Sequence, residues 1–407
     1  MSLIRPFRAV RPPVERVADV AAVPYDVVNS AEAAELAKGN PWSFLHVSRP
    51  EIDLPSGTDL YSDAVYAKAA ENFQRLIDEC PLATDAEPAL YVYTLKMGVH
   101  EQTGVVACCS IDEYDSDLIK KHERTRKDKE DDRTRHLLTI GAQTGLVFLT
   151  YRGVAAIDAA VAAIRTGKPL YDFVAPDGIS HTMWRVPDSD PLVELFGGVP
   201  ALYVADGHHR SASASRARAA RAAANPHHTG DEDYNFVLAV VFPADQLRIL
   251  PYNRVVKDLN GLSTDAFLAA VRTHFEVTED AGADPARGEF SMYLDGHWYG
   301  LKPPAGSIDA SDPIASLDVS VLQDRLLAPV LGVEDPRTDK RIDFVGGIRG
   351  TGELVRLVDS GRAAVGFSLH PTTLDDLMRI ADAGEIMPPK STWFEPKLRD
   401  GLVCHRI

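Results

Sequence analysis

The sequence predicts an α+β protein in which mixed sheets and helices alternate along the whole chain. Segments with the two-residue alternation of strands and segments with helical periodicity follow one another from end to end, rather than falling into separate blocks. Several strand candidates also form hairpins, of which MYLDGHWYGL, with Asp295-Gly296 at its turn, gives the strongest signal. A length of 407 residues predicts two or three domains, or one large domain with insertions.

Each element is predicted from its own local pattern. Helices are favoured where amphipathic or Ala-rich stretches lie between capping residues and Gly or Pro: a short one capped by Ser30, a long one that begins at GHHR, and those at 61–79, 155–165, 264–275 and after Thr372 or Thr373. Strands are favoured by apolar or alternating runs, at 145–151, at 201–206, on either side of 98–104, and in FVLAVVF paired antiparallel with LRILPYNRVV. A further hairpin is expected over 171–186, with its turn at 176–178.

Composition and charge exclude several classes of protein. Asp and Glu number 59 against 43 Lys and Arg, so the formal net charge is −16. This charge opposes generic association with nucleic acid, because phosphate neutralisation supplies most of that affinity. No run reaches the length of a membrane span or of a signal-peptide core. The four cysteines fit neither a disulfide framework nor a paired zinc site, so the cytoplasm is the expected compartment.

The sharpest local signal is ALYVADGHHR, where an apolar strand ends in Asp206 and Gly207 and a helix begins at once with His208, His209 and Arg210. Such a helix start aims free backbone N–H groups and the helix dipole at an anion. Gly207 lets the backbone approach closely, and the guanidinium of Arg210 is suited to phosphate oxygens. Asp206 is a candidate ligand for Mg²⁺, which binds one or two carboxylates together with substrate phosphates. An Asp N-cap followed by two surface histidines is the structural alternative.

The segment 119–136, which includes Lys121-His122-Glu123, is rich in charge. It holds eight Lys and Arg against five Asp and Glu, a local balance of +3 within a chain of net charge −16. A solvated helix with ion pairs is the structural alternative, but like charges four residues apart count against it. We therefore favour a function that needs several cations, with Arg126 and Arg133 as candidate phosphate-binding residues.

A third candidate lies near the C-terminal end. Two successive prolines forbid a continuing helix, so Lys390, Ser391 and Thr392 are presented on a stiff loop. Burial of Trp393 and Phe394 would explain the same segment as a packing anchor, and composition alone favours that alternative.

A domain boundary is expected near residue 285, where the chain is most linker-like. A large α+β unit over 1–285 would then contain the Lys-His-Glu and Asp-Gly-His-His-Arg motifs. A C-terminal α/β unit over 286–407 would contribute the Pro-Lys-Ser-Thr loop.

The whole chain resembles the family catalogued as domain of unknown function 1015. The resemblance is carried by IRPFRAVRP, VPYDVV, NPWSFLHVSRPEIDLP, IKKHERTRKDKEDDRTRH, ADGHHR, LPYNRVVKDLNGL, DPRTDKRIDFVGGIRG and MPPKSTWFEPKLRDGL. It is long and specific, but it implies no activity.

A more distant resemblance does imply an activity. The order Lys-x-His-Glu, then Val-x-Asp-Gly-His-His-Arg at a helix start, then Gly-Glu-x-x-x-Pro-Lys-x-Thr, is similar to the free serine kinase of the ParB/sulfiredoxin-like superfamily. The resemblance implies a ParB/sulfiredoxin-like core with large insertions, and phosphorylation of L-serine to O-phosphoserine by a nucleotide. Glu123 then matches the general base, and Asp206 the acid beside the metal. The matched phosphate-cradle residues are Gly207, His208, His209 and Arg210, and those matched to a loop near the amino-acid substrate are Lys390, Ser391 and Thr392.

This chain departs from the kinase pattern after that loop. The kinase continues with Arg-His where this chain has Trp393-Phe394, so contacts to a substrate carboxylate are expected from Arg337 or Arg341 instead.

These observations predict a cytoplasmic phosphotransferase that uses Mg²⁺ and ATP or ADP to phosphorylate a small hydroxy amino acid, with free L-serine as the first choice. Phosphoryl transfer depends on positioning and charge neutralisation, which a helix N-terminus, a metal-binding carboxylate and arginines supply. Nucleotide and amino acid are the expected partners, without nucleic acid or membrane, and a homodimer is allowed. Two alternatives stay open: a ParB-like nucleotide-binding switch or regulatory protein without turnover, and a zinc hydrolase that uses His208 and His209.

Overall fold

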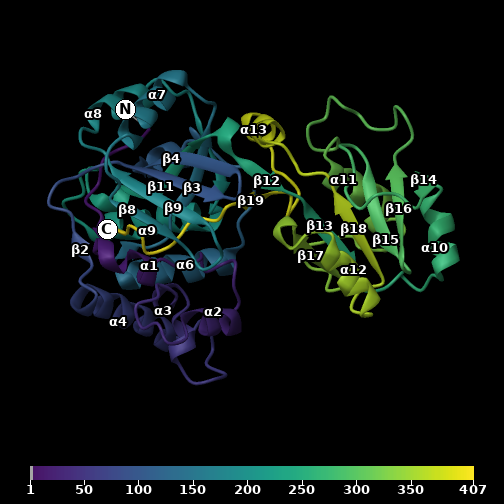
Figure 1. Ribbon diagram of the computed structural model, residues 1–407, viewed down its shortest axis with the longest axis horizontal. Coiled ribbons are helices and arrows are strands. Elements are labelled where there is room, and N and C mark those ends of the chain that lie inside the picture. Colours follow the sequence, from purple (N-terminus) through teal and green to yellow (C-terminus); the bar gives the residue numbers. More distant parts are fainter. Residues whose placement is uncertain (1–2) are drawn as a thin grey trace. The chain divides into compact units, whose positions relative to one another are not determined.

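The computed structural model describes residues 3–407 and divides the chain into two compact units (Figure 1). The first unit extends to Leu247 and also takes in Pro396–Ile407, and the second is Arg248–Glu395. Each contains its own sheet and helices, so the predicted α+β class is confirmed.

The first unit is built on an eight-stranded mixed sheet with the order β5-β10-β7-β11-β4-β3-β9-β8. The pairs β5 with β10 and β7 with β11 are parallel, and the other neighbours are antiparallel. In this order the strands are β5 (Ile119–Lys120), β10 (Leu202–Asp206), β7 (Val147–Tyr151), β11 (Phe236–Pro243), β4 (His100–Ser110), β3 (Tyr91–Met97), β9 (Ser180–Arg185) and β8 (Tyr171–Val174). The hairpins expected on either side of 98–104 and over 171–186 are both present.

Both faces of the central strands are covered, which explains their continuous apolar runs. Along β11 every residue from Val237 to Phe242 is at most 4% exposed. Residues of α5 (Ile111–Asp115), α7 (Ala155–Arg165) and α8 (Asp190–Phe196) share one apolar cluster with the sheet. The long helix α9 (His208–Ala224) contacts β7, β11 and α6 (Lys127–Ile140).

A helical layer completes this unit around a second apolar cluster, in which Phe44 and Phe73 are buried. Its elements are η1 (Val14–Arg16), α1 (Val17–Val20), α2 (Ser30–Ala37), α3 (Leu45–Ser48), η2 (Pro50–Asp53) and α4 (Asp63–Glu79). The expected helix start near Ser30 is present, but the cap is Asn29, whose side chain accepts from the N–H of Glu32 in a capping box. The remaining short elements are β1 (Val10–Arg11), β2 (Ala83–Thr84), β6 (Ala142–Gln143), η3 (Asp233–Asn235), η4 (Ala244–Gln246) and β20 (His405–Arg406).

The C-terminal segment Pro396–Ile407 is held in the first unit by backbone pairing. Ala22 and Asp400 exchange two backbone hydrogen bonds of 3.1 and 2.9 Å, and β20 pairs with β6. Gly401 has a φ of +83°, and a Cβ at this position would lie 2.6 Å from Cδ2 of Phe44. Only glycine therefore suits this turn.

The second unit contains a six-stranded antiparallel sheet with the order β14-β16-β15-β18-β13-β17. In this order the strands are β14 (Glu276–Glu279), β16 (His297–Lys302), β15 (Phe290–Leu294), β18 (Val365–Leu369), β13 (Tyr252–Val256) and β17 (Ile342–Gly346), and β12 (Arg248–Leu250) pairs separately with β19 (Trp393–Glu395). Asp295 and Gly296 both have positive φ, as the predicted type I′ turn requires.

Helices cover parts of this second sheet. α12 (Gly352–Asp359) contacts β13, β15 and β18 and buries Leu354 against Val255 and Val345. Thr373 caps α13 (Leu374–Asp382) in a capping box with Asp376, as predicted for this position. The other helices are α10 (Thr264–Val271), α11 (Asp318–Leu322), which continues into one π-helical turn (Gln323–Leu327), and η6 (Gly347–Arg349).

Two expectations about chain organisation differ from these units. The division into 1–285 and 286–407 would cut the second sheet between β14 and β16, which are hydrogen-bonded neighbours. FVLAVVF and LRILPYNRVV were expected to pair, but β11 pairs with β4 and β7, whereas β13 pairs with β17 and β18. Both segments pair instead with strands that lie farther away in the sequence. No described helix is both long and apolar enough to cross a membrane.

Gly401→Ala should destabilise the first unit. The left-handed backbone costs about 1–2 kcal/mol for a residue with Cβ, and overlap with the buried Phe44 ring adds about 1–3 kcal/mol. Calorimetric unfolding measures the loss. Gly39→Ala, also in the first unit, is the matched control, because Gly39 has a φ of +74° but a Cβ there would meet nothing within 4 Å. Equal destabilisation by the two substitutions would contradict the contact with Phe44.

Candidate functional site

The site forms where two parallel neighbouring strands end at the same edge of the first sheet. In the register of β5 and β10, Ile119 lies opposite Leu202 and Lys120 opposite Tyr203. The residues that follow these two strands therefore emerge side by side. Gly207 then turns the chain into α9 with a φ of +94°, which favours glycine.

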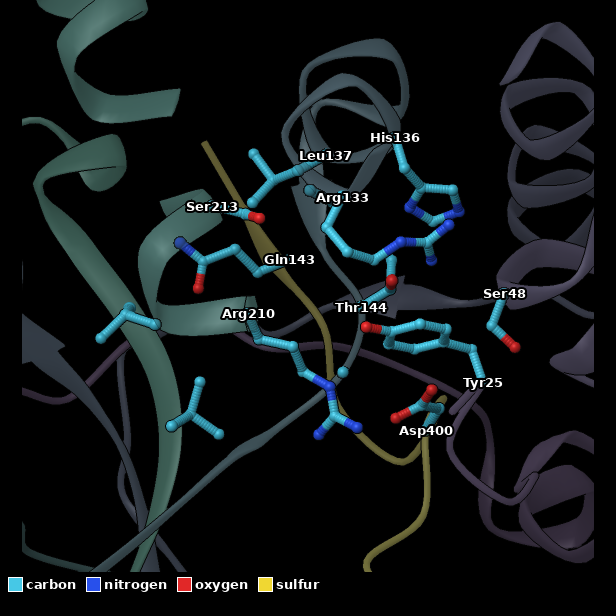
Figure 2. Close-up of a pocket in the computed structure, with 14 residues that line it drawn as sticks. Tyr25, Ser48, Arg133, His136, Leu137, Gln143, Thr144, Arg210, Ser213 and Asp400 are labelled. Carbon is cyan, nitrogen blue, oxygen red and sulfur yellow. The ribbon is translucent and has the colours of Figure 1, made fainter. Parts of the chain in front are cut away.

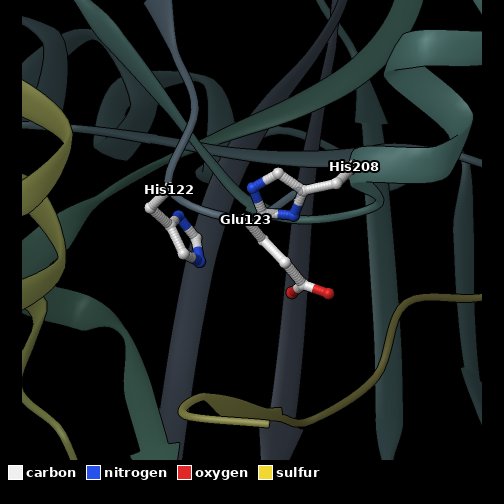
Figure 3. Close-up of side chains that lie close together, drawn as sticks. All are labelled: His122, Glu123 and His208. Carbon is white, nitrogen blue, oxygen red and sulfur yellow. The ribbon is translucent and has the colours of Figure 1, made fainter. Parts of the chain in front are cut away.

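His122, Glu123 and His208 meet at this edge (Figure 3). Each offers one potential ligand atom, and the three atoms lie within 4.8 Å of one another. The two imidazole rings are edge to face, with centroids 4.4 Å apart and planes at 89°. Burial lowers the pKa of His122 to about 4, and burial together with the neighbouring His122 lowers the pKa of His208 well below its ordinary value. Both rings are therefore neutral at pH 7.

Asp206 binds the start of α9 and a lysine from the C-terminal segment. Its Oδ1 accepts from the backbone N–H of Gly207 at 2.8 Å, and its Oδ2 accepts from Nζ of Lys397 at 2.9 Å. Burial alone would raise its pKa, but Lys397 and Arg210 together lower it below the ordinary value of an aspartate. A half-buried, ionised carboxylate therefore lies at the N-terminal end of a long helix.

Arg210 extends into a separate, small cavity of about 50 Å³. Its Nη1 donates to the carbonyl of Leu146 at 2.7 Å, and its Nη2 donates to the carboxylate of Asp26 at 3.1 Å. Figure 2 shows Arg133 and Arg210 both extending toward Tyr25, and their guanidinium carbons lie 4.2 and 5.6 Å from the centre of that ring. Arg210 thus has two polar partners within the protein.

Asp400 adds an acidic group to the same cavity. Burial raises its pKa to about 7, although Arg210 opposes this shift. Its Oδ1 has no hydrogen-bond partner among residues 3–407. The cavity therefore combines two arginines with a carboxyl group that titrates near neutral pH.

Two more residues matched to the phosphate cradle have other contacts. The Nε2 of His209 accepts from the backbone N–H of Arg126 at 3.1 Å, which links the start of α9 to the start of α6. The Arg126 side chain pairs with Asp128, and that of Arg133 with Asp132, each at 2.8 Å. The consecutive rings of His208 and His209 contact different neighbours, which does not favour a zinc site built on both of them.

Lys390, Ser391 and Thr392 belong to the second unit. The ammonium of Lys390 lies 5.6 Å from the centre of the Tyr252 ring, and its carbonyl accepts from Arg254. Ser391 is buried and donates to the carbonyl of Pro388 at 2.6 Å.

The two arginines proposed to bind a substrate carboxylate also belong to this unit. Arg337 pairs with Asp335, and Arg341 with Asp339.

Several residues of the site were not identified as candidates from the sequence. Lys397, Asp26 and Asp400 reach it only through contacts between distant parts of the chain, which no local pattern reveals. The position of His122, directly before the candidate base Glu123, was the one sequence feature that could have identified it as a site residue.

A family model described as a protein of unknown function (DUF1015) matches residues 4–320. The chain belongs to the DUF1015 family. The match confirms the resemblance seen in the sequence. No curated protein matches this DUF1015 chain.

Solved structures resemble the DUF1015 chain only distantly. A mutant free serine kinase in complex with AMP has 14% identity and a TM-score of 0.39, and the match covers 73% of this chain and 91% of the other. A conserved hypothetical protein from Pyrococcus furiosus has 14% identity, a TM-score of 0.37 and coverage of 73% and 94%. SbnI with a C-terminal truncation, from Staphylococcus aureus, has 11% identity, a TM-score of 0.38 and coverage of 73% and 86%. At these values the function must be argued from this chain's own residues.

The buried His136 on α6 should make the first unit less stable as the pH falls. Its Nε2–H donates to the carbonyl of Val47 at 2.9 Å, and burial together with Arg133 lowers its pKa from 6.5 to about 3. The unfolded chain therefore binds one more proton between these two pH values, so stability falls as the pH drops from 6.5 toward 3, by about 1.4 kcal/mol per pH unit.

Chemical unfolding across this pH range measures the slope. His136→Gln keeps an N–H donor but cannot be protonated, so it should flatten the dependence by this amount. An unchanged slope in that variant would mean that the ring is not held neutral.

Proposed function

We propose that this protein is a nucleotide-dependent phosphotransferase that phosphorylates the hydroxyl of a small hydroxy amino acid, with free L-serine as the first candidate. The observation that carries the proposal is the position of Glu123. Its carboxylate lies beside His208, the first residue of the 17-residue helix α9. A proton acceptor thus adjoins an anion-binding helix terminus.

The start of α9 supplies the electrostatics that phosphoryl transfer needs. The first N–H groups of a helix have no partner within the helix, and its dipole places partial positive charge at this end. Both features favour a phosphate group at the N–H groups of the first turn of α9, which begins at His208, because the N–H of Gly207 already donates to Asp206. Lys397 neutralises the carboxylate of Asp206, which would otherwise repel a phosphate group at this end of α9.

Glu123 would accept the proton of the substrate hydroxyl while the hydroxyl oxygen attacks the terminal phosphorus of ATP or ADP. The bond from that phosphorus to the bridging oxygen breaks, and the electron pair leaves with the shortened nucleotide. A correctly placed general base contributes about 10²–10⁴-fold to such a step. The resemblance of Lys-x-His-Glu to the motif of the free serine kinase supports the same role.

Asp206 fits the role of the carboxylate for Mg²⁺. It is ionised and half-exposed, and each of its oxygens can accept more than one contact. Mg²⁺ is commonly bound by one or two carboxylates together with substrate phosphates, and when bound it neutralises phosphate charge. Lys397 would hold the Asp206 carboxylate in position and offset its charge.

The residues that would bind the amino acid and the nucleotide are proposed mainly from the sequence. We propose Lys390, Ser391 and Thr392 as residues near the amino acid, following the resemblance of Pro-Lys-Ser-Thr to the kinase loop. Arg210, Arg126 and Arg133 stay candidates for nucleotide contacts, although each has a carboxylate partner. Nucleotide binding would then require those partners to be exchanged.

The direct test is incubation of the purified full chain with L-serine, Mg²⁺ and either ATP or ADP, with detection of O-phosphoserine by mass spectrometry. Product with either nucleotide is the expected result. No product from serine or from the other common hydroxy amino acids would contradict the proposal, and tight nucleotide binding without turnover would favour a nucleotide-binding switch.

Glu123→Gln should lower turnover by about 10²–10⁴-fold, because the amide cannot accept the hydroxyl proton. Nucleotide affinity, measured by calorimetric titration, should change little. Glu71→Gln is the control, since Glu71 is an exposed partner of Lys68 on α4. A Glu123→Gln chain that fails to fold, or one that retains full turnover, would remove Glu123 from the role of base.

A further inference from the structure

The cluster of His122, Glu123 and His208 has a property that the proposed transfer does not use. Two of its three members are imidazoles, which are poor partners for Mg²⁺ and good ligands for transition metals. They come from different segments, since His122 and Glu123 follow β5, and His208 opens α9 (Figure 3). The parallel pairing of β5 with β10 therefore assembles the set.

The two histidines are buried without the hydrogen bonds that buried rings normally make. His122 is 1% exposed and His208 is 4% exposed. Among the described residues, the Nε2 of His208 has no hydrogen-bond partner. The ring of His122 approaches the backbone of Val204, but neither of its nitrogens makes a hydrogen bond of good geometry. An unsatisfied buried polar group destabilises the folded state, so a native structure seldom retains several together without a ligand for them.

We propose that His122, Glu123 and His208 bind a divalent first-row transition metal ion, with Zn²⁺ as the best match. Two neutral imidazoles and one carboxylate form a known ligand set for zinc, in which a fourth position stays open for water or a small ligand. The neutral rings need lose no proton before they bind. The metal would satisfy one nitrogen of each ring, and Glu123 together with nearby Asp206 would balance its charge.

The present spacing suits such an ion after a small contraction. With metal–ligand bonds of about 2.0–2.2 Å, tetrahedral ligand atoms lie about 3.4 Å apart, and the three candidate atoms are within 4.8 Å of one another. The side chain of Glu123 is only partly buried, whereas both histidines are buried, so the contraction would fall mainly on Glu123.

The site does not depend on the proposed transfer, but it would affect it. A carboxylate that holds a metal ion is a much weaker proton acceptor, so Glu123 cannot serve both purposes at once. The metal-loaded form and the form competent for proton transfer are therefore distinct states of the same chain.

The test is a titration of the chelator-treated full chain with Co²⁺, followed by its visible absorption, and then displacement by Zn²⁺. One Co²⁺ per chain should bind and show ligand-field bands, and Zn²⁺ but not Mg²⁺ should displace it. Absence of bound Co²⁺ and Zn²⁺ at micromolar concentrations would overturn the inference.

Variants test which residues bind the ion. His122→Ala, His208→Ala and Glu123→Gln should each weaken Co²⁺ binding by more than about tenfold. His209→Ala is the matched control, because the adjacent ring contacts the N–H of Arg126 and should leave the affinity unchanged. Equal affinity in all four variants would place the ion elsewhere and overturn the assignment.

Circular dichroism identifies any variant that fails to fold, and His122→Gln and His208→Gln then replace the alanine variants. Because these titrations contain no nucleotide or amino acid, their outcome is separate from that of the phosphotransferase assay. If the chain binds Co²⁺ but forms no phosphoserine, the metal site is supported and the proposed function is contradicted. If it forms phosphoserine but binds no Co²⁺, the proposed function is supported and the metal site is contradicted.

Discussion

The parallel pairing of β5 with β10 is the interaction on which the candidate site depends. Antiparallel neighbours would send the residues after each strand to opposite edges of the sheet. In the parallel arrangement, Glu123 and His208, which are 85 positions apart in the sequence, emerge together. The pairing involves only a few residues, so most of the stability of this edge comes from the packing of β10 against β7 and of α9 against α6. A short stretch of sheet thus determines where the chemistry lies.

The Asp-Gly-His-His-Arg motif distributes its side chains rather than concentrating them. Successive residues on a helix point about 100° apart, so each of the first three residues of α9 reaches a different neighbour. His208 meets His122, His209 meets the start of α6, and Arg210 enters the cavity beside Tyr25. The motif therefore connects three parts of the first unit to one glycine turn. The motif therefore has a structural role, in holding these parts of the first unit together, in addition to the phosphate binding that the sequence predicts for it.

Features that depend on residues close together in the sequence, such as turns and helix caps, were predicted correctly. Features that depend on distant residues, such as strand partners, were not. The α+β class, the Asp295-Gly296 turn and the Thr373 cap are local consequences of turn chemistry, capping and apolar periodicity, and all are present. The partners of β11 and β13 were missed, because an apolar strand does not encode which of several apolar strands it joins. Lys397 could not be assigned to Asp206 for a similar reason, since the contact spans 191 positions. Candidate roles for Glu123 and Asp206 could be proposed from the sequence, but the residues that contact them could not be predicted.

The second unit is an insertion in the first, and it begins and ends at the antiparallel pair of β12 and β19. Arg248 and Glu395 are register partners, so the chain enters and leaves that unit at neighbouring positions. An insertion of this kind leaves the remainder of the first unit as an almost continuous polypeptide, interrupted at one point only. Such a topology allows the inserted part to be acquired, replaced or lost during evolution while the host sheet, with its site at the ends of β5 and β10, keeps its fold.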